Sequence, residues 1–160
     1  MAIKKPRSAW SMVVAVVTRK AIVMEELAAF LALNGAVVLL FSSLVGLALA
    51  RSLHLGTPAE HWHLLHAGGT SRGIMLLALA ASIRFAELPA TDLAWASGLV
   101  TFFVWTSILA MLVRCLTGMK GFHRGGPAAN KIVFYLYASG TVALPIGLVW
   151  LAIGFVQALR

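Results

Sequence analysis

Long apolar stretches dominate the chain and recur four times. Three of them carry no charged side chain, and the second contains Arg72 and Arg84. Each is about as long as the roughly 20 helical residues that cross the hydrocarbon core of a bilayer. The pattern therefore predicts an all-α integral membrane protein, with a bundle of four transmembrane helices at residues 27–50, 67–85, 93–113 and 132–158.

The first 26 residues differ from these spans. A short apolar run at residues 12–17 follows three basic residues, as in a secretory signal peptide, but Arg19 and Lys20 stand where small residues would mark a cleavage site. We expect this segment to be retained as an amphipathic helix that lies along the lipid headgroups. The expected organisation is an interfacial segment at residues 1–26 and a transmembrane domain at residues 27–160.

Composition strengthens the membrane assignment. Of the 160 residues, 61% are hydrophobic and 11% are charged, and the mean hydropathy is +0.92, whereas a soluble domain carries about 25% charged residues. The net charge of +8 would suggest nucleic acid as a partner of a soluble chain, but cationic loops of a membrane protein normally face anionic headgroups. We therefore expect the lipid bilayer as a partner and no nucleic acid. The basic residues lie on both predicted sides, and our working assignment is a bacterial inner-membrane protein with cytoplasmic termini.

Small residues mark the faces on which the spans are expected to touch. They are Gly140, Gly147 and Gly154 in the fourth span, and Gly35, Ser42 and Gly46 in the first. Such stripes allow helix backbones to approach closely in a membrane. The contacts that they predict lie either within one chain or between chains.

Candidate chemistry concentrates where the first loop enters the second span. Residues 61–73 contain three histidines, followed by a glycine-rich entry into the apolar stretch. If a helix begins at the start of this segment, His66, Gly69 and Gly73 share one face, and Arg72 points about 120° away. An imidazole beside small residues fits a flat macrocycle, and imidazole is a common axial ligand of haem iron. The alternative is that the two glycines serve helix packing and that His66 is a polar residue at the membrane surface.

The other histidines do not complete a metal site. His61, His63 and His66 do not converge on a helix, and no carboxylate or thiolate is placed to complete a tetrahedral zinc site. A second haem-ligating imidazole at bilayer depth is lacking as well, because His54 and His123 lie in predicted loops. An iron bound at His66 would therefore keep one open face, which favours chemistry at the metal over electron transfer.

Arg72 is the other polar outlier. An arginine inside a span costs at least about 2.5–3.5 kcal/mol on insertion scales. Its side chain either extends to the membrane surface or pairs with an anionic group, which is a haem propionate, a substrate oxygen or Glu60. His123 and Arg124, in the glycine-rich loop after the third span, are further candidates for binding haem propionates.

Trp62, His66, Gly68 and Gly73 lead into the second span, and Trp105 lies in the third. This pattern resembles the styrene oxide isomerase family of small four-helix membrane enzymes, with weaker similarity over most of the chain after residue 27. The resemblance implies a homotrimer that holds haem b at each subunit interface, with His66 as the axial ligand. It also implies that ferric iron acts as a Lewis acid on an epoxide oxygen, so that the ring opens and rearranges by hydride shift to an aldehyde.

Three positions depart from the family. Where its members have an asparagine, a tyrosine and an acidic residue thought to orient the substrate, this chain has Arg72, Met111 and Phe103. A cationic Arg72 can still hydrogen-bond an epoxide oxygen, but it disfavours a nearby carbocation. The departures motivate a second hypothesis, in which the chain is a haem-binding carrier, sensor or electron-transfer subunit without isomerase activity.

The first hypothesis remains a haem-b-dependent membrane isomerase that acts on a small hydrophobic epoxide. In it His66 binds the iron, and Gly69 and Gly73 clear space for the macrocycle. Arg72 and Met111 are the candidate catalytic residues. The predicted substrate pocket is lined by Phe103, Trp105 and Met111. A small multidrug transporter is disfavoured, because the first and third spans offer no buried acid for proton coupling.

Overall fold

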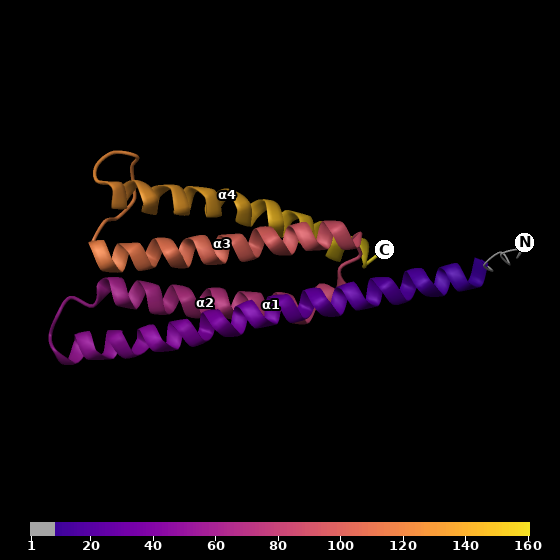
Figure 1. Ribbon diagram of the computed structural model, residues 1–160, viewed down its shortest axis with the longest axis horizontal. Helices are drawn as coiled ribbons and strands as arrows, with labels where there is room; N and C mark the ends of the chain where they lie inside the picture. Colours follow the sequence, from indigo (N-terminus) through magenta and orange to yellow (C-terminus); the bar gives the residue numbers. More distant parts are fainter. Residues whose placement is uncertain (1–8) are drawn as a thin grey trace, which may run out of the picture.

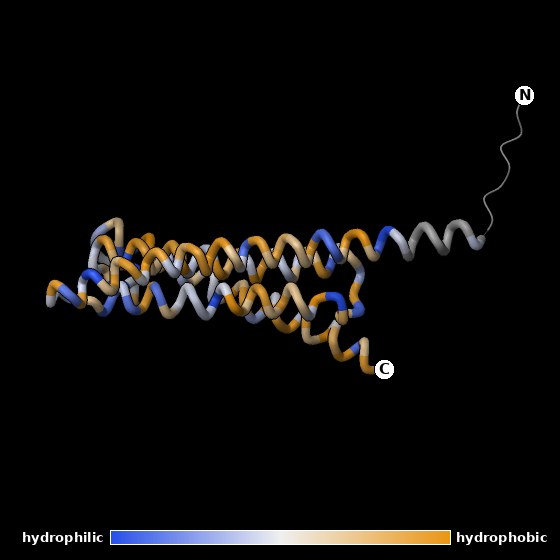
Figure 2. The backbone as a smooth tube through the Cα atoms, turned by 90° about the horizontal axis from the view of Figure 1, so that it is seen from below, coloured by the Kyte–Doolittle hydropathy of each residue, from blue (hydrophilic) through white to orange (hydrophobic). Residues whose placement is uncertain are grey.

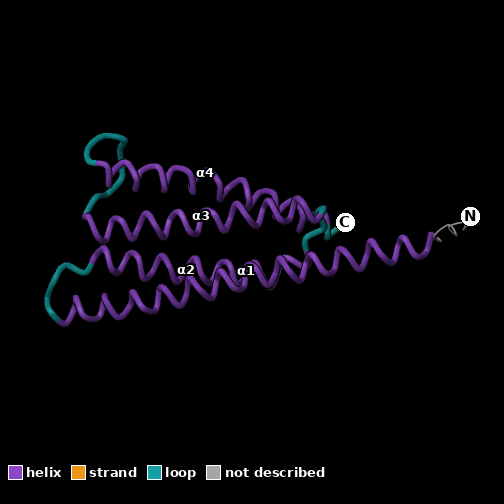
Figure 3. The backbone as a smooth tube through the Cα atoms, viewed as in Figure 1, coloured by secondary structure: helices purple, strands orange, loops and turns teal. Residues whose placement is uncertain are grey.

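The computed structural model describes residues 9–160, with side chains at residue 10 and from residue 18 onward. Its four long helices lie side by side with short connections (Figures 1 and 3), and all four are long and apolar enough to cross a membrane. The described residues contain no strand. The predicted all-α, four-helix membrane architecture is thereby confirmed. The helices are α1 (Ala9–His54), α2 (Glu60–Ser82), extended by the 3-10 turn η1 (Ile83–Phe85), α3 (Ala90–Thr117) and α4 (Ala128–Gln157).

Each helix runs beyond its apolar stretch, so the connections are shorter than the loops expected from hydropathy. Helix α2 begins at Glu60, seven residues before the second apolar stretch. Helix α3 ends at Thr117 and is capped by Gly118, whose φ of 71° is left-handed and whose N–H donates to the Arg114 carbonyl oxygen at 2.9 Å. Pro89 and Pro127 stand directly before α3 and α4, where a missing N–H costs little. Residues 61–73, which contain the three histidines, therefore lie entirely within α2.

The N-terminal segment is not a separate helix in the part of the chain that the structure describes. Helix α1 runs without interruption from Ala9 to His54 and projects beyond the bundle (Figures 1 and 2). Neither glycine nor proline occurs between Ala9 and Asn34 to break it. At 1.5 Å per residue the helix is about 69 Å long, more than twice the bilayer core of about 30 Å. The expectation of a distinct interfacial helix is thus corrected for residues 9–26, and residues 1–8 lie outside the described part.

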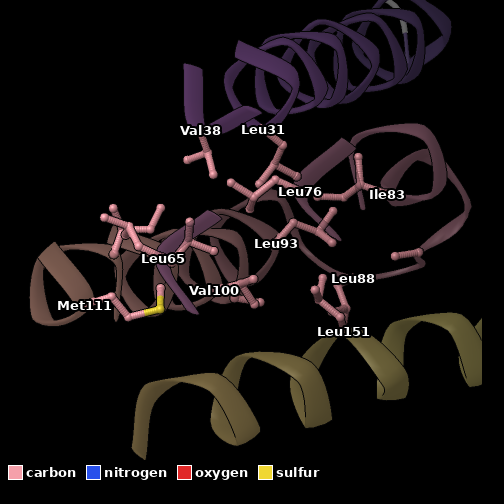
Figure 4. Packing of buried hydrophobic residues seen from close by; sticks show 14 of the residues in the cluster. Leu31, Val38, Leu65, Leu76, Ile83, Leu88, Leu93, Val100, Met111 and Leu151 are labelled. Carbon is pink, nitrogen blue, oxygen red and sulfur yellow. The ribbon is translucent and has the colours of Figure 1, made fainter. Parts of the chain in front are cut away.

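The bundle is built from two helical hairpins. Helix α1 packs extensively on α2 and α3 on α4, and a smaller contact between α2 and α3 joins the pairs. Figure 4 shows the apolar core at this junction, where Leu31 and Val38 of α1 approach Leu76 of α2 and Leu93 of α3. Large apolar side chains remain exposed on the outer faces, as lipid contact requires. The α2–α3 junction is consequently where the two hairpins meet.

The small-residue stripes pack within the chain. A Cβ added at Gly35 would lie 3.0 Å from the Gly73 carbonyl oxygen, so α1 and α2 cross with their backbones almost touching. A Cβ at Gly147 would lie 2.9 Å from the Ala96 carbonyl oxygen, which places α4 equally close to α3. Both stripes therefore hold the hairpins together.

Candidate functional site

His66 lies in the second turn of α2 with its imidazole turned toward α1. Its Nδ1 is 2.8 Å from the Ser42 carbonyl oxygen. The ring rests against Gly46, where an added Cβ would come within 3.1 Å of two ring atoms. Because a carbonyl oxygen only accepts hydrogen bonds, Nδ1 is the donor of this bond, and in the neutral imidazole the lone pair then lies on Nε2. Among the described residues no hydrogen bond engages Nε2. This half-buried imidazole therefore offers one free metal-binding nitrogen.

Ser42 and Thr70 fix the backbone around His66. The Ser42 hydroxyl donates to the His66 carbonyl oxygen at 2.6 Å and lies 2.8 Å from Thr70 Oγ1. Thr70 Oγ1 in turn donates to the same carbonyl at 2.9 Å. From the sequence, Ser42 is identifiable only as a small residue in a packing stripe. Its position on the helix face opposite His66 was the signal, but a serine at that spacing is equally typical of plain helix packing.

The glycines expected to clear space for a macrocycle are covered by α1. A Cβ at Gly69 would lie 3.1 Å from the Ser42 Cβ, and one at Gly73 would lie 2.6 Å from Leu39 Cγ. Both glycines are buried. The predicted shared face of His66, Gly69 and Gly73 exists, but it packs against α1 of the same chain. The expected role of the two glycines as an open shelf is corrected to a role in helix packing.

Arg72 is turned into the bundle, toward α3. Its Nε donates to Ser107 Oγ at 2.6 Å, and its Nη1 donates to the Gly68 carbonyl oxygen at 2.9 Å. The guanidinium lies 5.2 Å from the centre of the Phe103 ring, close enough for a cation–π contact. Because α2 begins at Glu60, Arg72 is about 18 Å from the start of the helix. The alternatives of an extended side chain and of an ion pair with Glu60 are therefore both wrong.

Met111 and Phe103 lie beside Arg72, as the sequence grouped them. Met111 is buried, and its Sδ would lie 2.8 Å from a Cβ at Gly68, so the thioether packs on α2 next to the guanidinium. We call this contact the α2–α3 seam and define it by Gly68, Arg72, Phe103, Ser107 and Met111. The seam lies on a different face of α2 from His66, which contacts α1. Within one chain the structure thus separates the predicted catalytic pair from the predicted axial ligand.

Trp105 ties α3 to α1. Its Nε1–H donates to Asn34 Oδ1 at 2.9 Å, and the Asn34 amide donates to the Phe30 carbonyl oxygen at 2.8 Å. An indole held in this way serves as a link between the two hairpins. Its place in a substrate pocket with Phe103 and Met111 stays a prediction.

Replacing Asn34 with leucine should lower the free energy of unfolding by about 0.6–1.7 kcal/mol, the range for hydrogen bonds between membrane helices. The loss follows because the Trp105 N–H is left without its acceptor. Reversible unfolding in mixed micelles measures it. Ser43→Ala is the matched control, because the Ser43 hydroxyl bonds only to the Leu39 carbonyl oxygen of its own helix. Equal stability of the two variants would contradict the link.

The glycine-rich loop that contains His123 and Arg124 is ordered around Asn130. The Asn130 amide donates to the carbonyl oxygens of His123 and Gly125, both at 2.8 Å, and its Oδ1 accepts from the Gly121 N–H at 2.9 Å. His123 and Arg124 are exposed at the end of the bundle where α2 begins (Figure 1). Their side chains are accessible to an anionic group, and neither contacts His66.

A cavity and a search for metal-binding clusters give two further observations about possible sites. A cavity of about 1340 Å³ opens at the opposite end of the bundle, between the N-terminal half of α1, η1 and the end of α4, and contains none of the predicted site residues. In the part of the chain that the structure describes, no three His, Cys, Asp or Glu side chains gather into a metal-binding group.

Comparison with known proteins identifies the chain at family level. The family profile described as styrene oxide isomerase matches residues 27–156, which cover the second and third spans and most of the first and fourth. Neither the curated proteins nor the solved structures gave a match. The matched range contains His66, the α2–α3 seam and the Asn34–Trp105 link. With most of its length covered by this profile, the chain belongs to the styrene oxide isomerase family.

Proposed function

We propose that this chain is a membrane-embedded isomerase that uses haem b to convert a small hydrophobic epoxide to a carbonyl compound. Family membership supports an isomerase-like membrane protein. The observation that carries the haem assignment is the His66 imidazole, whose Nδ1 proton is held by the Ser42 carbonyl and whose Nε2 is free. Ferric haem bound there supplies a Lewis acid for the epoxide oxygen.

The donor set around His66 fits an axial ligand. Metal-binding histidines typically donate their second N–H to a carbonyl or carboxylate, which fixes the tautomer and makes the ligating nitrogen more basic. Ser42 supplies that carbonyl from α1, and the Ser42 and Thr70 hydroxyls hold the backbone of His66 in register with it.

We further propose that the haem lies between chains of a homotrimer. The face of α2 that was expected to receive the macrocycle is filled by α1, which supports placing the group at the exposed flank of His66, where a second copy completes the site. His123 and Arg124 remain the proposed contacts for its propionates. The protein is proposed to reside in a bacterial inner membrane with cytoplasmic termini.

A second candidate function has its own support. Arg72 and Met111 sit in the α2–α3 seam, on a different face of α2 from His66. If the same separation holds in the assembly, the chain is a haem-binding carrier, sensor or electron-transfer subunit that performs no isomerisation.

Product analysis separates the two functions. Purified protein incubated with styrene oxide and no reductant should release phenylacetaldehyde in amounts far above the enzyme concentration, since isomerisation consumes no electrons. Gas chromatography of the extracted products measures this. A protein that carries haem but forms no aldehyde from any small aryl or alkyl epoxide would establish the second function instead.

Arg72→Asn should keep its full haem content and raise epoxide turnover several-fold. Haem is retained because Arg72 faces α3 and not His66. Turnover rises because the change removes a positive charge that disfavours a developing carbocation. Haem per chain and aldehyde release are measured on the same preparation. An unchanged turnover would show that Arg72 serves the seam and not the substrate.

A further inference from the structure

The large cavity at the end of the bundle where α4 ends lies apart from the proposed haem site. Its volume is about 1340 Å³, and its walls come from one face of α1, the end of α2 with η1, and the end of α4. Six of the lining residues are alanines, whose short side chains leave the space between these elements open. Clefts that bind drug-sized molecules measure about 300–1000 Å³. The size of this cavity therefore favours a larger ligand.

Two cations and two carboxylates line the cavity. They are Lys20 and Glu25 of α1, Arg84 of η1, and Glu87 in the connection to α3. All four side chains are exposed. Within the described part of the chain none of them forms an ion pair, whereas Arg114 and Glu60 approach to 3.8 Å at the other end of the bundle. Opposite charges that share a cavity without pairing are suited to a ligand that carries both signs itself.

These charges lie at the depth expected for lipid headgroups. Glu25 precedes the charge-free stretch of α1 that begins at residue 27, and Arg84 stands where the second span ends. Figure 2 shows hydrophilic segments of α1 and of the connection after η1 at the same end of the bundle. Apolar side chains line the cavity beside them, among them Met24 and Phe155, which we call the apolar wall. The cavity thus combines a charged rim with an apolar wall, as binding of an amphiphile requires.

We propose that this cavity binds a zwitterionic phospholipid that carries a primary ammonium group, such as phosphatidylethanolamine. Lys20 and Arg84 donate to its phosphate, and Glu25 and Glu87 accept hydrogen bonds from its ammonium group. The glycerol backbone and acyl chains pack on the apolar wall. The headgroup and the four side chains each sum to zero charge, so the complex leaves no charge uncompensated at the membrane surface.

The same chemistry disfavours the other common headgroups. The quaternary ammonium of phosphatidylcholine has no N–H to donate to a carboxylate. Phosphatidylglycerol brings a negative charge and no cation, so Glu25 and Glu87 would repel it. The proposal is independent of haem and of isomerase activity, since the cavity contains none of the residues assigned to either.

Native mass spectrometry of the full chain in detergent micelles tests the proposal. The probes are phosphatidylethanolamine, phosphatidylcholine and phosphatidylglycerol with identical acyl chains. The wild-type chain should bind phosphatidylethanolamine about tenfold more tightly than either of the others, as expected for one additional charge-assisted hydrogen bond. Soluble phosphoethanolamine should bind far more weakly than the lipid, because it lacks the acyl chains that pack on the apolar wall.

Neighbouring residues of α1 supply matched controls. Lys20→Gln should weaken binding of all three lipids, since each contains a phosphate, and Glu25→Gln should remove most of the preference for phosphatidylethanolamine. Arg19→Gln and Glu26→Gln should do neither. Arg19 and Glu26 are equally exposed and stand directly beside the other two residues, but they do not line this cavity.

Ala81→Trp tests whether the lipid occupies the cavity itself. Ala81 is an exposed lining residue, so a large side chain there should block lipid binding while circular dichroism shows an unchanged helix content. Equal affinity for the three lipids, or tighter binding of phosphatidylglycerol, would overturn the proposal. So would a preference that survives in Glu25→Gln or Ala81→Trp, or one that Glu26→Gln removes as completely as Glu25→Gln does.

Discussion

His66→Ala should purify from the membrane in normal yield with almost no haem. The imidazole is the proposed protein ligand, and loss of even an outer-sphere partner of such a ligand weakens metal affinity by about 10–100-fold. The fold should persist, because the imidazole is half-buried and its Nδ1 bonds to the Ser42 carbonyl oxygen, so no fully buried side chain is lost. The measurement is haem per chain from the pyridine haemochrome and protein absorbance.

His63→Ala is the control for this experiment. His63 lies on the same segment one turn earlier and is exposed, so its removal should leave haem content unchanged. Free imidazole added during purification should restore part of the haem to His66→Ala by replacing the missing ligand. A His66→Ala protein that carries a full haem complement would show that the iron is held elsewhere.

Gly73→Val should disrupt the α1–α2 hairpin and, as a result, weaken haem binding at His66. An added Cβ would lie 2.6 Å from Leu39 Cγ and 3.1 Å from the Gly35 carbonyl oxygen, so the helices must move apart. Overpacking of this kind costs about 1–3 kcal/mol. Because α1 supplies the Ser42 carbonyl that fixes the His66 tautomer, haem affinity should fall together with stability.

Gly98→Val is the matched control for the hairpin. Gly98 is also a glycine within a membrane helix, but a Cβ there meets nothing within 4 Å. Its replacement should change the free energy of unfolding by less than about 0.5 kcal/mol and leave haem binding intact. Unfolding in mixed micelles and haem titration provide both readouts. If the two variants behave alike, the close approach of α1 and α2 does not position His66.

Hydropathy and helical periodicity predicted much of the fold because membrane spans are defined by length and polarity alone. The face shared by His66, Gly69 and Gly73, and the different direction of Arg72, also followed from 100° per residue. What occupies that face could not be predicted, since a glycine stripe accommodates a neighbouring helix and a flat ligand equally well. The structure shows α1 there.

The hydrogen-bond partners of His66 and Arg72 could not be predicted from the sequence, for the same reason. Ser42 and Ser107 are common small residues in membrane helices, and only the crossing of the hairpins brings them to His66 and Arg72. Arg114 looked like a loop cation because hydropathy ended the third span at residue 113, whereas α3 continues to Thr117 and carries it into the bundle. The continuity of α1 could not be predicted from hydropathy, because charged residues near its start end the apolar stretch but do not end the helix.

The absorption spectrum of the purified ferric protein, recorded before and after addition of styrene oxide, tests the assignment of a haem-dependent isomerase most directly. With His66 as the single protein ligand and one open iron face, we predict a five-coordinate, high-spin haem spectrum that shifts when the epoxide is added and is lost in His66→Ala. A six-coordinate, low-spin spectrum that the epoxide leaves unchanged, or a protein that purifies without haem, would contradict it.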